Sequence, residues 1–275
     1  MKLECEICPH HCKLNEGQIG ICHGRINKNG KVVSENYGKI TAIALDPIEK
    51  KPIYHFYPGS RILSVGSYGC NLNCPFCQNC DISMSGGDEY PGDIVSPGEL
   101  VNKALELQSR NNIGIAYTYN EPLIGYEYVY DCSVLAKQKG LKNIVVTNGY
   151  INEEPFRKLL PHIDALNIDL KGFTDAFYRE LRGDLETVKR SIEMAAKNCH
   201  VEVTTLVIPD KNDSEEEMEA LSRWIAGLHP EIPLHISRFF PRWKMQDKES
   251  TPIKTIYHLA KVARKHLKHV YEGNC

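Results

Sequence analysis

From about residue 60 onward, short runs of apolar and β-branched residues recur along the chain, with helical patterns between them. Runs of this kind are typical of parallel strands that are buried on both faces. Strands that alternate with helices predict an α/β fold with a parallel sheet. The predicted strands cover residues 62–67, 113–118, 143–147, 165–169, 201–208 and 234–238.

The helical patterns carry start and stop signals. Ser96-Pro97-Gly98-Glu99 is a capping box with proline at the first helical position, and Gly140 suits a left-handed C-cap. Six strand–helix units are fewer than the eight of a closed barrel. We expect a partial (βα)6 TIM-like barrel, with a doubly wound sheet as the alternative; both bind ligands at the carboxyl ends of the strands. The predicted helices cover residues 100–109, 123–139, 156–160, 174–198 (broken at Gly183), 213–228 and 251–268.

Residues 1–60 break this regular pattern. They are rich in cysteine and contain two apolar runs, residues 31–37 and 40–45, which we expect to pair as a hairpin turning near Gly38. We therefore divide the chain into a cysteine-rich N-terminal segment, residues 1–60, and a barrel, residues 61–275.

Charge and composition narrow the class of protein. The 33 Lys and Arg against 35 Asp and Glu give a net charge of −2, which does not favour a nucleic-acid partner held through its phosphates. No apolar run approaches the roughly 18 residues that a membrane span needs, and residues 1–5 lack the hydrophobic core of a signal peptide. We expect a cytoplasmic protein without a membrane partner.

The 11 cysteines of the chain are its unusual feature. In a large chain without a secretion signal, clustered cysteines are more typical of metal binding or redox chemistry than of disulfides. Three of them, Cys132, Cys199 and Cys275, are isolated and receive no role. The other eight form two groups: Cys5, Cys8, Cys12 and Cys22, then Cys70, Cys74, Cys77 and Cys80.

The second group begins directly after the first predicted barrel strand, with the spacing CxxxCxxC over Cys70, Cys74 and Cys77. Thiolates are soft ligands that suit iron–sulfur clusters or zinc. Three cysteines hold three irons of a 4Fe–4S cluster and leave the fourth iron open to a ligand. A zinc knuckle with Cys80 as its fourth ligand is the alternative.

This loop resembles the signature of the radical S-adenosylmethionine (SAM) superfamily, with Phe76 at its aromatic position. The resemblance implies a 4Fe–4S cluster on the three cysteines, with SAM on the open iron. One electron, from a donor such as flavodoxin or ferredoxin, then cleaves SAM to a 5′-deoxyadenosyl radical that abstracts hydrogen.

Three other strand ends resemble SAM-binding segments of the same superfamily. Thr118-Tyr119-Asn120-Glu121-Pro122 stands where relatives carry a GGE-type motif, although an ordinary helix-capping turn has the same composition. The Thr147-Asn148-Gly149 turn and the Asp169-Leu170-Lys171 segment resemble those of activating enzymes, although Asp169 and Lys171 also fit a buried ion pair. The resemblance implies that SAM is bound by Phe76, Thr118, Asn120, Glu121, Thr147, Asn148, Asp169 and Lys171.

Nearly the whole chain resembles radical SAM proteins of the AmmeMemoRadiSam system, which are described as pyruvate formate-lyase activating enzyme-like. The likeness includes residues 5–12, 20–22, 44–59 and 235–241. The family usually has tryptophan where this chain has Cys80, and it continues into a further cysteine pair beyond the position of Cys275. A glycyl residue on a partner protein is the substrate that the resemblance suggests. A small metabolite, or a non-catalytic electron-transfer protein, are the alternatives.

Two features remain open on the sequence alone. Cys5, Cys8, Cys12 and Cys22 fit tetrahedral zinc, an auxiliary iron–sulfur cluster, or free thiols. A saturated metal site there is either structural or an electron relay. A further group of side chains either lines a substrate entrance or lies on a surface loop, and we favour the surface loop: Lys50, Lys51, Tyr54 and His55.

Overall fold

The structure is a computed structural model that describes residues 2–90 and 94–275. The strands are β1 (Leu3–Glu4), β2 (Lys13–Leu14), β3 (Arg25–Lys28), β4 (Lys31–Ser34), β5 (Ala42–Pro47), β6 (Arg61–Gly66), β7 (Asn112–Tyr117), β8 (Lys142–Thr147), β9 (Ala165–Asp169), β10 (His200–Val207), β11 (Leu234–Arg238) and β12 (Val270–Gly273). The α-helices are α1 (Cys80–Ser83), α2 (Pro97–Glu106), α3 (Tyr126–Gln138), α4 (Glu153–Leu159), α5 (Asp175–Glu180), α6 (Leu185–Ala196), α7 (Glu215–Leu228) and α8 (Ile253–Ala263).

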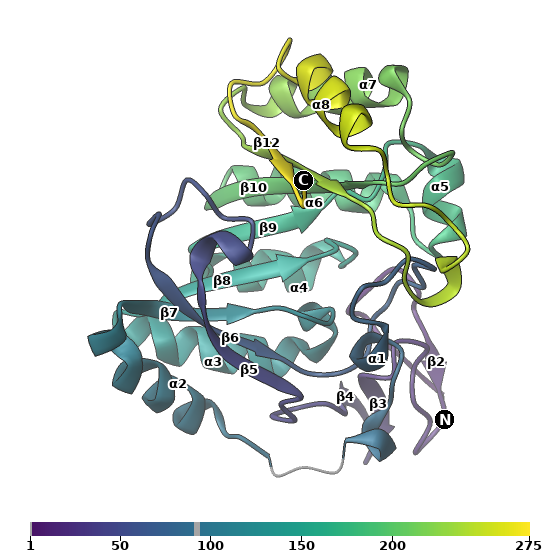
Figure 1. Cartoon of the computed structure of the whole chain (residues 1–275). Helices are drawn as coiled ribbons and strands as arrows, with labels where there is room; N and C mark the ends of the chain where they lie inside the picture. The colour runs from purple at the N-terminus through teal and green to yellow at the C-terminus, as the bar shows by residue number, and fades with distance from the viewer. Residues whose placement is uncertain (1, 91–93) are drawn as a thin grey trace.

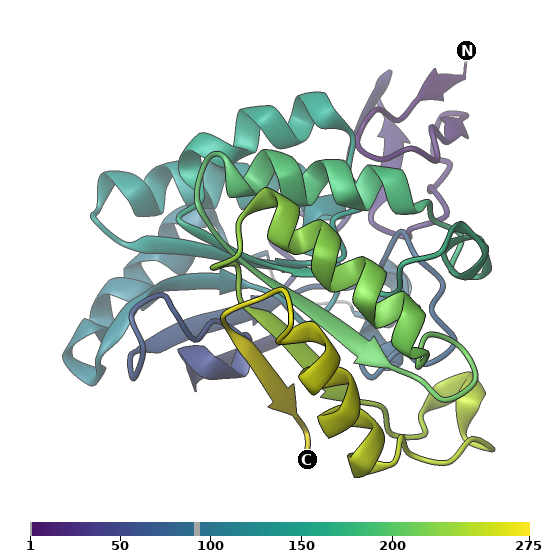
Figure 2. The ribbon, with the colours of Figure 1, turned by 90° about the horizontal axis from the view of Figure 1, so that it is seen from above.

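One curved sheet organises the described residues (Figure 1). Its eight strands follow the order β12-β11-β10-β9-β8-β7-β6-β5, with β6 to β12 parallel and β5 antiparallel to β6. Helices cover the outer face, as seen from above in Figure 2. The sheet therefore has the predicted α/β architecture of a partial barrel, extended by the edge strands β5 and β12.

The strands are apolar on both faces, which is why they read as continuous hydrophobic runs. On β7 and β8, Ile115 and Val145 belong to the large core on the helical side, whereas Ala116 and Ile144 belong to a smaller cluster inside the barrel. All four side chains are fully buried. Successive residues of a strand point to opposite faces, so both faces of the sheet exclude water.

The prediction that residues 31–37 pair with residues 40–45 as a hairpin is wrong. The structure pairs β3 with β4 across Asn29-Gly30, both of which have positive φ (54° and 70°), and it pairs β5 with β6. An Asn-Gly pair favours the tight turn that joins two antiparallel strands, and this signal outweighs Gly38. The division at residue 60 stays a prediction, and β5 joins the sheet from its N-terminal side.

The structure confirms most of the predicted helix starts and breaks. Ser96 and Glu99 form the predicted capping box at the start of α2, and the expected break at Gly183 separates α5 from α6, whose N-cap is Asp184. The last helix is shorter than predicted, because α8 ends at Ala263 and the chain then forms β12. None of the helices in residues 2–90 and 94–275 has the length and apolarity that a membrane crossing requires.

A segment between β5 and β6 lies inside the barrel, at the amino ends of the strands (Figure 1). We call residues 48–56 the crossbar. Two of its side chains, Ile48 and Ile53, are fully buried against residues of four strands. This apolar cluster consists of Ile48, Ile53, Ile62, Ala116, Ile144 and Ala165.

Polar contacts attach the crossbar to the other half of the sheet. The carboxylate of Glu202, on β10, accepts hydrogen bonds from the backbone N–H groups of Tyr54 (2.8 Å) and His55 (2.7 Å). The His55 ring lies 2.6 Å from the Tyr271 hydroxyl on β12. The crossbar therefore spans the barrel from one edge strand toward the other. The expectation of a surface loop holds for Lys50 and His55, which are exposed, but not for Lys51, whose side chain is only 5% exposed.

Candidate functional site

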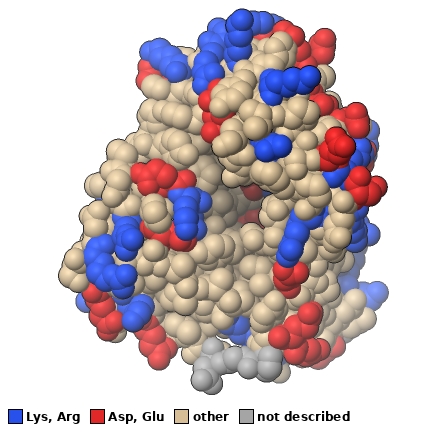
Figure 3. All heavy atoms as spheres, viewed as in Figure 1, with Lys and Arg blue, Asp and Glu red and all other residues tan. Residues whose placement is uncertain are grey.

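A cavity of about 290 Å³ lies at the carboxyl ends of the barrel strands. Figure 3 shows a hollow near the middle of the face that Figure 1 presents. The cavity is lined by Cys70, Leu72, Cys74, Phe76, Cys77, Gln78, Asn79, Ser83, Met84, Thr118, Tyr119, Asn120, Glu121, Val146, Thr147, Asn148, Asp169, Lys171, Thr204, Leu206, Ser237 and Asn274. Every site residue predicted in the barrel is in this set.

The cysteine loop that follows β6 contributes three thiols to the cavity. Backbone hydrogen bonds fix the loop at Cys70, whose N–H donates to the Cys22 carbonyl (3.1 Å), and at Asn73, whose N–H donates to the Leu181 carbonyl (3.0 Å). Phe76 is buried and stacks on Phe177, with ring centroids 6.1 Å apart. The aromatic position of the motif therefore anchors the loop against α5.

The three thiols are in a setting that suits a metal cluster. Burial raises the pKa of Cys74 to about 12 and raises the pKa values of Cys70 and Cys77. Isolated thiols here would stay protonated, whereas iron would stabilise the thiolates. The donor set fits an iron–sulfur cluster with three cysteine ligands. Cys80, the fourth ligand of the zinc alternative, is buried at the start of α1 and is not part of the described cavity lining.

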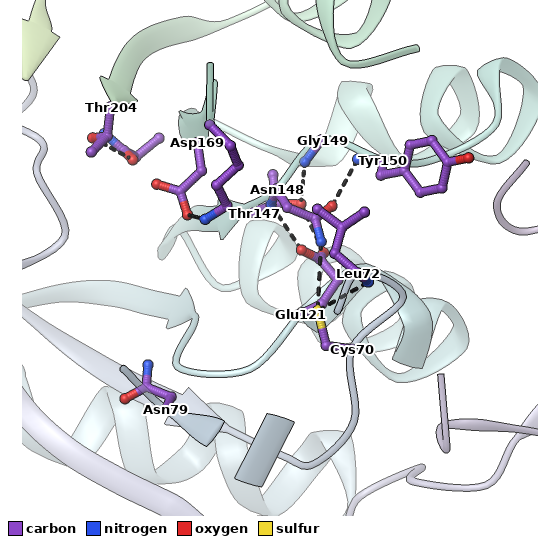
Figure 4. Close-up of polar contacts among 12 residues, drawn as sticks. Cys70, Leu72, Asn79, Glu121, Thr147, Asn148, Gly149, Tyr150, Asp169 and Thr204 are labelled. Carbon is purple, nitrogen blue, oxygen red and sulfur yellow. Dashed lines mark hydrogen bonds and ion pairs between the residues drawn. The ribbon is translucent and has the colours of Figure 1, made fainter. Parts of the chain in front are cut away.

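Glu121 connects the ends of β7 and β8 (Figure 4). Its Oε1 accepts hydrogen bonds from the Thr147 hydroxyl (2.7 Å) and the Leu123 N–H (3.0 Å), and its Oε2 accepts one from the Asn148 N–H (2.8 Å). Burial raises the pKa of Glu121 to about 7, although these hydrogen bonds favour the carboxylate and limit the rise. Oε2 retains a lone pair for a further donor.

Two asparagines hold the cysteine loop against these strand ends. Asn120 accepts from the Ser67 N–H (2.9 Å) and donates to the carbonyls of Tyr68 (3.0 Å) and Gly69 (3.1 Å). The amide of Asn148 lies 3.7 Å from the Cys70 sulfur and donates to the Asn71 side chain (2.9 Å). The side chain of Asn120 therefore forms its hydrogen bonds with backbone groups, whereas that of Asn148 contacts a predicted cluster ligand.

Asp169 and Lys171 form an ion pair at the end of β9, with 2.6 Å between Nζ and Oδ2 (Figure 4). Burial alone would lower the pKa of Lys171, but Asp169 and the nearby Cys74 and Cys77 raise it. Lys171 thus remains a cation beside the cysteine loop. Both side chains line the cavity, as their spacing predicts.

The sequence prediction missed several members of the lining. Tyr119 adopts a positive φ of 73°, and its hydroxyl donates to Asp46 (2.9 Å), which also pairs with Lys51 (2.9 Å). Thr204 and Ser237, on β10 and β11, face the same cavity. Ser237 is next to the end of its predicted strand, residues 234–238, and this position was the available signal, whereas Thr204 is in the middle of residues 201–208 and offered none.

The N-terminal cysteines lie outside this cavity. Cys5, Cys8 and Cys22 are buried and Cys12 is half-buried, and none of the four contributes to the described cavity lining. Their segment instead contacts the cysteine loop, where the Cys70 N–H donates a hydrogen bond to the Cys22 carbonyl.

The fold and the site together define a class of protein, an open parallel α/β barrel with three thiols presented after its first parallel strand. A sequence model of this class matches residues 64–224, more than half of the chain, and the chain belongs to the radical SAM superfamily. Membership indicates an enzyme, with a 4Fe–4S cluster and SAM as its cofactors.

The chain is also similar to curated proteins and to a solved structure. MJ0808, an uncharacterized protein of Methanocaldococcus jannaschii, is 42% identical over 99% of this chain and 81% of its own length. A pyruvate formate-lyase-activating enzyme of Clostridium pasteurianum is 28% identical over 62% of this chain and 71% of its own. The structure of a radical SAM methyltransferase from Sphaerobacter thermophilus covers 79% of this chain and 67% of its own, with a TM-score of 0.61 and 17% identity. That structural likeness shows the fold alone.

Proposed function

We propose that the chain is an activating-enzyme-like radical SAM enzyme of the AmmeMemoRadiSam type. The observation that carries the proposal is the convergence of Cys70, Cys74 and Cys77 with Glu121 and Lys171 on one cavity. When bound, a 4Fe–4S cluster on these thiols supplies one electron for the cleavage of SAM to methionine and a 5′-deoxyadenosyl radical. A one-electron donor of the flavodoxin or ferredoxin class reduces the cluster.

In this proposal, SAM is bound by residues that follow two strands, Glu121 after β7 and Lys171 after β9. The free lone pair of Glu121 Oε2 accepts from the SAM ammonium group, and Lys171 pairs with the SAM carboxylate. Thr147 and Asn148 keep Glu121 in place through their hydrogen bonds, and Asp169 orients Lys171. Asn120 positions the cysteine loop, because its amide is committed to backbone groups. Phe76 fixes the loop, and Thr118 lines the cavity.

The proposed substrate is a glycyl residue on a partner protein. The likeness to a pyruvate formate-lyase-activating enzyme supports this choice. A small polar metabolite is the second candidate, which the hydroxyls of Thr204 and Ser237 and the amide of Asn274 in the cavity lining favour. These groups offer hydrogen bonds to a small molecule that lies beside SAM.

Anaerobic assay of 5′-deoxyadenosine tests the proposal. The protein is loaded with iron and sulfide, mixed with SAM and dithionite, and compared with Cys74→Ala and its matched control Cys80→Ala. We expect reductant-dependent product from the wild type and from Cys80→Ala, and no product from Cys74→Ala. A fully loaded protein that forms no product would contradict the proposal and favour a non-catalytic electron-transfer protein.

A further inference from the structure

Tyr119, in the cavity lining, has a backbone conformation that bulky residues rarely adopt. Its φ of 73° lies in the left-handed region, where a large side chain is unfavourable. The carbonyl of Tyr119 accepts a 2.7 Å hydrogen bond from the side chain of Asn79, in the cysteine loop. Figure 4 shows Asn79 apart from the contacts that Glu121 makes. A strained residue that other contacts hold in place beside a candidate site indicates a functional constraint.

The side chain of Tyr119 points away from the contacts of Glu121 and toward the edge strand β5. Its hydroxyl donates a 2.9 Å hydrogen bond to Asp46 on β5, whereas the carboxylate of Glu121 accepts from residues at the end of β8. The ring packs on Gly66, where an added Cβ would lie 2.8 Å from its Cδ2 atom. Gly66 therefore leaves the space that this ring occupies.

Asp46 and Lys51 form a buried ion pair beside the same ring. The Nζ atom of Lys51 lies 2.9 Å from Oδ2 of Asp46 and 4.5 Å from the centroid of the Tyr119 ring. The Lys51 side chain is 5% exposed and that of Asp46 is 11% exposed. A buried ion pair contributes little to stability by itself, because both charges lose their hydration. The contacts of this pair with Tyr119 indicate that it holds the tyrosine in place.

The charge of Asp46 fixes the direction of its hydrogen bond with Tyr119. Burial alone would raise the pKa of Asp46, but hydrogen bonds from Lys51 and Tyr119 lower it well below its usual value. An ionised carboxylate only accepts hydrogen bonds, so the tyrosine hydroxyl is the donor. Hydrogen bonds to a charged group are stronger than those between neutral groups. Asp46 is therefore a firm anchor for the ring.

We propose that Asp46 and Lys51 act through Tyr119 as positioning residues for SAM. The inference rests on the proposed function, in which Glu121 accepts a hydrogen bond from SAM. Tyr119 is two residues before Glu121, so anchors on its ring and carbonyl restrict the backbone that carries this carboxylate. Asp46 and Lys51 are not in the described cavity lining, and both precede residues 64–224, which the radical SAM model matches. β5 and the crossbar thus support the site from outside the matched region.

Equilibrium binding of SAM to protein of equal iron content tests the proposal. Tyr119→Phe removes the hydroxyl and keeps the ring, and we expect SAM to bind roughly threefold to tenfold more weakly. At saturating SAM this variant should form 5′-deoxyadenosine at the wild-type rate, because positioning changes the binding of SAM rather than its cleavage. Unchanged affinity for SAM, or a loss of rate alone, would overturn the proposal.

Tyr37→Phe is the matched control. It removes a hydrogen bond of 2.7 Å from a tyrosine hydroxyl to Asp131, away from the described cavity lining. This variant should bind SAM as tightly as wild type does. An equal loss of affinity in Tyr37→Phe and Tyr119→Phe would overturn the proposal, since it would show a general effect of losing such a bond.

A double-mutant cycle tests whether Asp46 and Tyr119 act together. Asp46→Asn should also weaken SAM binding, and Asp46→Asn/Tyr119→Phe should bind no more weakly than the weaker single variant. Losses that multiply would overturn the shared action. Lys51→Met should weaken binding, whereas Lys50→Met should not, although this exposed lysine lies 3.3 Å from the same carboxylate.

The outcome for the wild type separates this inference from the proposed function. A wild type that holds its iron but binds no SAM would overturn both together. SAM binding that Tyr119→Phe leaves unchanged would overturn this inference alone.

Discussion

The hydroxyl of Thr147, at the end of β8, donates a 2.7 Å hydrogen bond to the carboxylate of Glu121, which follows β7. Both groups are buried. The pair joins two neighbouring strand ends and fixes the orientation of a carboxylate that faces the cavity. Four predictions follow from contacts of this kind around the barrel.

Removal of the Thr147 hydroxyl should destabilise the protein. Thr147→Val leaves Glu121 with one donor fewer, and we expect a loss of about 1–3 kcal/mol in the free energy of unfolding. Thr147→Ser keeps the hydroxyl and should remain within about 1 kcal/mol of wild type. Urea denaturation measures both variants, and equal stabilities would argue against this role for the hydroxyl.

Lys171 should determine the affinity for SAM. Lys171→Met removes the cation, and because a hydrogen bond between charged groups contributes about 1.5–3 kcal/mol, we expect SAM to bind roughly tenfold or more weakly. Lys171→Arg should lie between this variant and wild type. Equilibrium binding of SAM to protein of equal iron content is the measurement, and unchanged affinity in Lys171→Met would contradict the assignment.

Gly69 should not tolerate a side chain. It has a φ of +85°, and an added Cβ would lie 2.3 Å from the Cys22 carbonyl oxygen. Gly59 has a similar φ of +79° but open space around it. Gly59→Ala should therefore show only backbone strain, about 1–2 kcal/mol, whereas Gly69→Ala should be roughly 3 kcal/mol or more less stable than wild type. Thermal unfolding separates the two, and equal effects would show that the close approach is unimportant.

Glu202 should make stability depend on acid pH. Burial alone would raise its pKa, but hydrogen bonds from His200, His235 and two crossbar N–H groups lower it from 4.5 to about 2. A lowered pKa in the folded state stabilises the protein above pH 4.5, and this contribution disappears as the pH falls through 2. The shift corresponds to about 3 kcal/mol.

Glu202→Gln is the variant that checks this dependence. It should unfold about 3 kcal/mol more easily than wild type at pH 7, and the difference should shrink between pH 4.5 and 2. Denaturant unfolding at several pH values gives the comparison. A difference that stays constant over this range would show that Glu202 does not titrate as described.

The sequence predicts the barrel strands well because their side chains are apolar on both faces. Each strand can therefore be recognised from its local sequence alone. It mispairs β5, since pairing is decided by contacts between strands, and the Asn29-Gly30 turn was overlooked. The crossbar was also unpredictable. The Tyr54 N–H meets Glu202 across 148 residues of sequence, and no local pattern encodes that contact.

The candidate site also combines features that the local sequence predicts with contacts that it does not predict. Motif spacing is sufficient to bring Cys70 and Lys171 to one cavity, because parallel strands end at the same edge of the sheet. Spacing does not reveal which polar groups already form hydrogen bonds within the protein. Only the three-dimensional structure shows that the Asn120 amide bonds backbone carbonyls and that Tyr119 reaches Asp46.

The crossbar also has a kinetic consequence. Ile48 and Ile53 of this segment close the apolar interior of the barrel at the amino ends of its strands, whereas the cavity lies at the carboxyl ends. On the proposed function, SAM and substrate would enter from this one side, and a substrate bound after SAM would cover it. We therefore expect ordered kinetics, in which SAM binds first and its fragments leave last.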